Sequence, residues 1–313
     1  TMDYGKIDFS GIHLRDAEGN TLSVNGALEH DGSFQDFRYS IDIGCQKALV
    51  MNLPPSRNDM FYGKVYGTGE AFIRGDEHEC RISANAMTAN KTEFSLSIGG
   101  ASNAHDNSFI TFVDHNAPIA KKEPHQSEPE SNTKVYLDLQ IEATPEAKVD
   151  IIIDPKTGDR LEGRGEGNLK VSYDMAADDI KIFGTYTLQQ GSFFFTFQNV
   201  IRKEFTIRPN SKVIFSGDPE NPQVDASAHY STTASLRDLF GSDISQVSTN
   251  RTSVPVNCIL YLKGNLMNPV ISFGIELPQS DESVSSQVKS IINTDEMLMR
   301  QILYLLVFNK FYT

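Results

Sequence analysis

The sequence contains no tryptophan, only three cysteines and no long hydrophobic run. A membrane-spanning helix needs about 18 consecutive apolar residues, and the longest apolar stretch, residues 302–308, is far shorter. Cys45, Cys80 and Cys258 are scattered and odd in number, so they indicate no disulfide framework, although a disulfide between two of them stays open. The lack of tryptophan argues against an adhesive or carbohydrate-binding sandwich, which needs exposed aromatic platforms.

Basic residues are also in the minority. Lysine and arginine total 28 against 41 aspartate and glutamate residues, which gives a net charge of −13. Nucleic-acid binding requires clustered lysine and arginine to meet the phosphate backbone, and no such cluster occurs. We therefore expect no nucleic-acid partner.

Motifs for catalysis and metal binding are missing as well. The seven histidines form no H-x-x-H or H-E-x-x-H pair, and there is no G-x-S-x-G. His78, Glu79 and Cys80 are adjacent, but zinc sites need three or four convergent ligands. Residues 154–159 lack the alternating oxygen ligands and closing glutamate of a calcium loop. Four carboxylates that could be paired are expected to be solvated instead: Glu162, Glu166, Asp178 and Asp179. We predict no enzyme, no metal site and no cofactor.

Alternation of apolar and polar residues dominates the chain and predicts β-strands. It is clearest over residues 22–28, 37–43, 135–141, 169–173, 180–188 and 256–262. Turn residues such as His30-Asp31-Gly32 and Asn221-Pro222 separate these runs every 8–12 residues or so. The fold class is therefore predicted to be all-β.

A short internal echo links the two halves of the sequence. Gly67-Thr-Gly69 and Gly165-Glu-Gly167 each enter a strand that is followed by a charged turn and another strand. The echo suggests related β-modules, or it marks bends where the backbones approach closely.

We predict four segments. An N-terminal β-module spans residues 1–113, a polar linker or mobile loop spans 114–134, a C-terminal β-domain spans 135–277, and a helical segment spans 278–313. Within the last segment helices are expected over 280–292 and 294–308, with Thr294 as an N-cap. A short helix is also expected around Leu236 and Phe240. Both ends of the chain interrupt a pattern, so we expect a fragment of a longer protein.

Residues 193–197 hold four phenylalanines. In a strand, Phe193, Phe195 and Phe197 would share one face and Phe194 would lie on the other, and a register slip of one residue would exchange the faces. Such a strand is typical of a sandwich core. However, strands from 135 to 275 all offer an apolar face and few helices are available to cover it. The sheet must therefore fold on itself or leave a trough.

The C-terminal half resembles the C-terminal domain of the TamB family, the translocation and assembly module proteins of bacteria with two membranes. The matching motifs lie between residues 161 and 313. They are a G-x-G-x-L strand starting at Gly165, a G-x-Y-x-L-x-x-G-x-[FY]-x-F run from Gly184 to Phe195, the strand containing Phe205-Thr-Ile207, the turn from Gly217 to Pro222, and the terminal IINTDEMLMRQILYLLVFNKFY.

This resemblance implies an elongated, curved, taco-like sheet with a hydrophobic groove and short C-terminal helices. It also implies a periplasmic location, an inner-membrane anchor upstream, and an outer-membrane barrel partner of the TamA/BamA kind. Two roles follow from it. One is phospholipid transport between the inner and outer membranes, and the other is outer-membrane protein insertion or secretion by β-strand pairing.

For lipid transport, the predicted groove residues are assigned to one face of the sheet. They are Tyr186, Leu188, Phe193, Phe195, Phe197, Phe205, Ile207 and Phe215. Shielding an acyl chain of roughly sixteen carbons is worth on the order of 10 kcal/mol, at about 0.8 kcal/mol per methylene. An open apolar channel would favour this role, whereas a filled core with a bare sheet edge would favour strand pairing.

Overall fold

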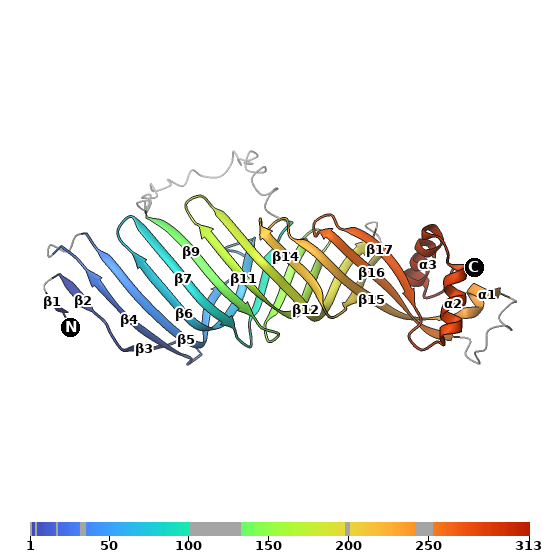
Figure 1. The fold of residues 1–313 in the computed structure, drawn as a ribbon, viewed down its shortest axis with the longest axis horizontal. Coiled ribbons are helices and arrows are strands. Elements are labelled where there is room, and N and C mark those ends of the chain that lie inside the picture. Colours follow the sequence, from blue (N-terminus) through green and yellow to red (C-terminus); the bar gives the residue numbers. More distant parts are fainter. Residues whose placement is uncertain are drawn as a thin grey trace, which may run out of the picture.

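The computed structural model describes residues 2–3, 5–16, 18–31, 36–99, 133–197, 201–241 and 253–313. These residues form one 17-stranded sheet and three short helices, as the all-β prediction required. The molecule is elongated, with the N-terminal strands at one end and the helices at the other (Figure 1). The predicted linker at 114–134 lies outside the described residues except for its last two positions.

The strands run obliquely to the long axis of the molecule (Figure 1). Their bounds are β1 (Met2–Asp3), β2 (Lys6–Asp8), β3 (Ile12–Arg15), β4 (Thr21–Glu29), β5 (Arg38–Leu53), β6 (Phe61–Gly75), β7 (Glu79–Thr88), β8 (Glu93–Ser97), β9 (Lys134–Ala143), β10 (Lys148–Asp154), β11 (Asp159–Asp174), β12 (Asp179–Phe197), β13 (Ile201–Ile207), β14 (Ser211–Gly217), β15 (Gln223–Ser235), β16 (Ser253–Asn265) and β17 (Val270–Glu276). The helices are α1 (Leu236–Phe240), α2 (Glu282–Ile291) and α3 (Asp295–Phe308).

Long strands alternate with pairs of short strands across the sheet. β4, β5 and β6 pair in order, and β6 then faces β7 with one half and β8 with the other. β7 pairs with β9 and β8 pairs with β10, both in parallel, and the long strand β11 joins both partners. β12 pairs with β11 and splits again between β13 and β14, which both contact β15 before β16 and β17 complete the sheet. The predicted N- and C-terminal modules thus share one sheet.

The glycine echo lies on β6 and β11, the long strands that each face a pair of short strands. A Cβ at Gly69 would lie 2.1 Å from the carbonyl oxygen of Asn85, and one at Gly165 would lie 2.1 Å from that of Thr187. Both positions therefore need glycine because a neighbouring backbone comes too close for a side chain. A β-bulge also falls at Arg164/Gly165, where it bends the strand.

Strand register places apolar residues on one face of the sheet, here called the inner face. One row of paired residues crosses six strands without a polar side chain: Ile43, Ala71, Ala84, Leu139, Val171 and Ile182. The adjacent row, on the outer face, is mostly polar: Asp42, Phe72, Ser83, Asp138, Ser172 and Lys181. This is the consequence of period-two alternation in every strand.

The inner face is covered at the C-terminal end of the molecule. Leu161, Leu188, Phe205 and Leu260 are almost fully buried there. They belong to one cluster that also contains Leu96 and Ile151 of the short strands β8 and β10, so this part of the sheet folds onto itself.

Helix α3 closes this end. Thr294 is its N-cap and accepts a hydrogen bond from the Met297 amide, as predicted, and Asn309 ends it in the left-handed conformation. Leu306 borders the same small space as Phe205 and Phe273, so α3 lies over the inner face. α1 begins at Leu236, close to its predicted place.

Candidate functional site

The structure brings together the residues predicted to line a groove. Tyr186, Leu188, Phe193, Phe205, Ile207 and Phe215 are all buried in one cluster, and Phe195 is half-buried against it. Phe197 ends β12, and its side chain lies outside the described residues. Phe194 points to the outer face, where the Arg160 guanidinium lies 4.1 Å from its ring. The predicted register of this strand is confirmed, while contact with lipid remains a prediction.

These aromatic side chains fill the space between them. The rings of Phe193 and Phe195 stack at a centroid distance of 5.5 Å, and Phe205 meets Tyr230 at 6.1 Å. The space bordered by Phe195, Phe205 and Leu306 has no room for a water molecule. This region is packed as densely as a protein core.

The inner face is more accessible in the N-terminal half. Where β5, β6, β7 and β9 pair around Ile43 and Leu139, its large apolar residues are half-buried and lie outside the core cluster, whereas Leu96 of β8 belongs to that cluster. We call the following residues the open inner face: Ile41, Ile43, Ile73, Ile82, Leu137, Leu139 and Ile141, with Ala71, Ala84 and Ala86 between them. No charged side chain interrupts these described rows.

Sequence analysis identified these strands but did not assign them to a groove. The aromatic run at 193–197 predicted a groove because its side chains are large and apolar. In the structure these large rings instead fill the core cluster. The missed signal is the pairing of isoleucine and leucine with small residues. Ile43 is opposite Ala71, and Ala84 is opposite Leu139, which leaves room above the sheet.

Two cysteines lie on the open inner face. Cys45 pairs with Gly69, and Cys80 pairs with Gly75, in line with Ile43 and Ile82. Both are half-buried, whereas Cys258 is fully buried, and all three are free thiols. Burial raises the pKa of Cys258 to about 12.

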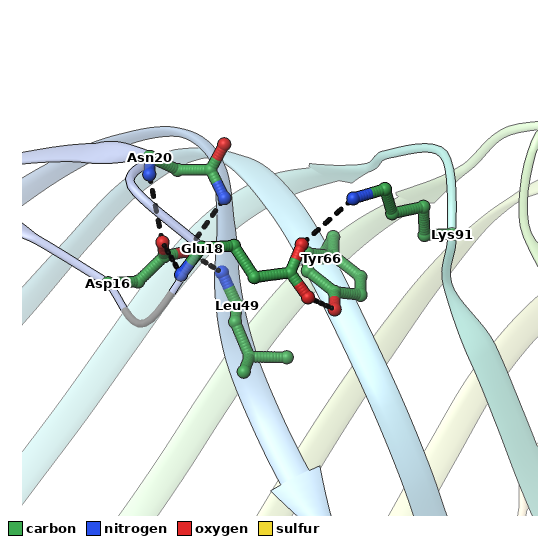
Figure 2. Close-up of polar contacts among 6 residues, drawn as sticks. All are labelled: Asp16, Glu18, Asn20, Leu49, Tyr66 and Lys91. Carbon is green, nitrogen blue, oxygen red and sulfur yellow. Dashed lines mark hydrogen bonds and ion pairs between the residues drawn. The ribbon is translucent and has the colours of Figure 1, made fainter.

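A polar cluster fastens the turn between β3 and β4 to the long strands (Figure 2). Asp16 accepts hydrogen bonds from the Leu49 amide at 2.9 Å and from the Asn20 side chain at 2.8 Å. The Asn20 side chain, followed by the Leu49 amide, lowers the pKa of Asp16 to about 2. Glu18 accepts a hydrogen bond from the Tyr66 hydroxyl at 2.5 Å and forms an ion pair with Lys91 at 2.9 Å. These contacts tie the turn to β5 through Leu49 and to β6 through Tyr66, so the cluster acts as a clamp.

The carboxylates considered for catalysis are dispersed among separate partners. Glu162 lies 2.9 Å from Lys148, and Asp179 lies 2.9 Å from Lys181. Asp178 accepts a hydrogen bond from the Tyr173 hydroxyl at 2.8 Å. Glu166 accepts one from Gln189 at 3.4 Å. Within the described residues, no three His, Cys, Asp or Glu side chains are grouped so that they could hold a metal ion.

One free edge of the sheet is β17, which pairs in register only with β16, and at the other end of the molecule β3 pairs only with β4 among the described strands. A cleft of about 590 Å³ lies beside it, between the sheet and helices α2 and α3. Its lining combines Ile259, Phe273 and Val288 with Glu276 and Lys289. An edge strand presents unpaired backbone groups, and a strand from a partner could pair with them.

An ion pair fixes β17 from the outer face. Arg208 Nη1 lies 3.0 Å from Glu276 Oε1, and this contact lowers the pKa of Glu276. His229 lies nearby on β15, and its pKa is lowered by burial and then by the charge of Arg208.

The chain matches a known protein family. A family model described as the TamB C-terminal domain matches residues 10–313. The match extends the resemblance seen from residue 161 onward to nearly the whole chain. No curated protein sequence matches the chain. Among the helices that the structure describes, none has the length and hydrophobicity to cross a membrane.

Proposed function

The chain belongs to the TamB C-terminal domain family, and on that premise we propose that it shields lipid acyl chains during phospholipid transport between the inner and outer membranes. In this proposal it is a periplasmic, non-enzymatic part of a protein anchored in the inner membrane. Its partners are phospholipid acyl chains and an outer-membrane barrel protein of the TamA/BamA kind.

The observation that carries the proposal is the open inner face. It is apolar across β5, β6, β7 and β9, carries no charged side chain, and is partly exposed. An exposed apolar surface of this extent costs free energy in water and is typical of a binding surface. A flexible acyl chain needs no directed polar contacts, so a row of isoleucine, leucine and alanine side chains is sufficient to hold it.

Energetics favour the same occupant. Transfer of one methylene from water to an apolar surface is worth about 0.8 kcal/mol, so a chain of roughly sixteen carbons gains on the order of 10 kcal/mol when fully shielded. The half-buried residues can supply this shielding, since each still has apolar area exposed. The filled cluster around Phe193 and Phe205 has no such area left, and we assign lipid contact to the open inner face.

The experiment is native mass spectrometry of the purified chain with lipid extraction. Ile43→Asp places a charge on the open inner face. Ser40→Asp is the matched control, because Ser40 is exposed on the outer face of the same strand. We expect phospholipid with the wild type and with Ser40→Asp, and its loss in an Ile43→Asp chain whose circular dichroism is unchanged. A lipid-free wild type, or retention of lipid by Ile43→Asp, would refute the proposal.

A second candidate is assembly or secretion of outer-membrane proteins by strand pairing. The free β17 edge and the adjacent apolar cleft favour it. Val270 is 73% exposed at the start of this strand. A Val270→Cys chain should form disulfide crosslinks with single-cysteine strands of a barrel partner, whereas the same change at Val50, far from this edge, should not. Equal crosslinking at both positions would contradict this role.

A further inference from the structure

Helix α3 is apolar on both of its sides. One side packs on the sheet through Ile302, Leu305 and Leu306, which are almost fully buried. Large apolar side chains on both sides of a helix are normally covered by protein or lipid. The described residues of this chain enclose only one side of α3.

The other side of α3 is exposed. We call its four apolar residues the outward face: Met297, Tyr304, Val307 and Phe308, with exposed fractions of 39%, 37%, 45% and 59%. Tyr304 lies between Phe308 at 5.3 Å and Tyr312 at 4.8 Å, measured between ring centroids. The rings therefore form a continuous apolar surface.

We propose that the outward face docks on the surface of a lipid bilayer. Aromatic and aliphatic side chains beside basic residues are the composition of a helix that lies in the interface between acyl chains and headgroups. Arg300 lies among the outward residues, with its guanidinium 5.2 Å from the Tyr312 ring centroid, and Lys310 follows the end of the helix. Both side chains are long enough to reach headgroup phosphates. The one acid beside it, Glu296, is paired with Arg300 at 3.0 Å.

The position of α3 in the fold is compatible with binding to a flat bilayer surface. α3 lies at the C-terminal end of an elongated molecule (Figure 1). An elongated body can meet a plane with its end without a clash along its length. The outward face also consists of helix side chains, whose backbone groups are bonded within the helix. It therefore offers no unpaired backbone groups with which a partner β-strand could form hydrogen bonds. Its apolar side chains fit a lipid surface better than a β-strand.

The absence of tryptophan makes the test direct. Phe308→Trp introduces the only indole in the chain at the most exposed outward residue. Phe183→Trp is the matched control, because Phe183 is 43% exposed on the outer face of β12. Both chains are mixed with phosphatidylcholine vesicles, whose zero net charge avoids repulsion of a chain with net charge −13.

We expect a blue shift of the emission and quenching by brominated acyl chains at position 308 only. In flotation of the full chain, Tyr304→Asp combined with Phe308→Asp should lower the bound fraction at least about tenfold. Val50→Asp is the control, since Val50 is 53% exposed on β5. An unshifted Phe308→Trp chain, equal shifts at both positions, or flotation that survives the double substitution would overturn the proposal.

The test also separates this proposal from lipid shielding in the sheet. Ile43→Asp should still float with vesicles, while the double α3 variant should still carry the extracted phospholipid. Loss of both properties in either variant would contradict independent sites. Flotation without any extracted lipid would leave docking intact and refute only the shielding role.

Discussion

The Tyr66 hydroxyl donates a hydrogen bond to Glu18 Oε1 at 2.5 Å, although the two residues, on β6 and in the β3–β4 turn, are 48 positions apart in the sequence. This hydrogen bond is the main reason why the pKa of Glu18 is lowered and that of Tyr66 is raised. The two residues therefore connect the β3–β4 hairpin to the long strand β6 (Figure 2).

Removal of this hydroxyl should weaken the connection. In Tyr66→Phe we expect the pKa of Glu18 to rise toward its usual value of 4.5, as measured by carboxyl NMR titration. Because the folded-state pKa is lowered, the stabilisation is present above pH 4.5 or so and is lost as the pH falls. Tyr62→Phe, four residues earlier on the same strand, is the control. An unchanged Glu18 titration would contradict the role of Tyr66.

His229 should make stability depend on pH near neutrality. Its folded-state pKa lies below the usual 6.5, mainly because of burial. The unfolded chain therefore binds more protons, and stability present above pH 6.5 is lost as the pH falls through the folded-state pKa. Urea unfolding of His229→Gln should show a smaller decline between about pH 7 and pH 5 than the wild type. His78→Gln, at an exposed turn, should follow the wild type, and an equal change in both would contradict the assignment.

In the first copy of the glycine echo, one glycine should tolerate substitution by alanine and the other should not. Gly69→Ala places a methyl group 2.1 Å from the Asn85 carbonyl oxygen, whereas at Gly67 the nearest atom is 3.6 Å away. We expect Gly69→Ala to lower the free energy of unfolding by about 1–3 kcal/mol through overpacking. Gly67→Ala should stay within about 0.5 kcal/mol. Denaturant titration measures both, and equal effects would contradict the close approach.

Thiol alkylation should report both stability and lipid occupancy. Cys258 is fully buried with a pKa of about 12, so it should react with iodoacetamide only when the chain unfolds. Cys45 and Cys80 are half-buried on the inner face and should react in the folded chain, Cys45 slowly because burial raises its pKa, and both more slowly when phospholipid is bound. Mass spectrometry of the labelled peptides distinguishes the three. Alkylation of Cys45 that is insensitive to lipid would contradict occupancy of this face.

Local features of the fold were predictable because they depend on nearby residues. Period-two alternation predicted the strands and their inner residues, and the Thr294 cap predicted the start of α3. The orientation of Phe193 and Phe195 followed from the same alternation. Each of these predictions needed only a few consecutive residues.

The division of the inner face into covered and open parts was not predictable in this way. Ile43 and Phe205 occupy equivalent positions in alternating strands, yet Phe205 is 1% exposed and Ile43 is half-buried. The difference arises from the cluster that joins strands distant in sequence, such as β8, β10 and β13, and from the cover that α3 provides. Asp16 likewise resembles an ordinary turn residue until its contact with the Leu49 amide is known.

The unbroken apolar row from Ile43 to Ile182 has an evolutionary consequence. A row built by repetition has no fixed dimension, because each added hairpin extends it by two strand spacings, or about 10 Å. Duplication of a hairpin could thus change the reach of such a protein without inventing any new chemistry. Selection would then act on the length of the sheet and on the average hydrophobicity of the row, while most individual side chains along it could change freely.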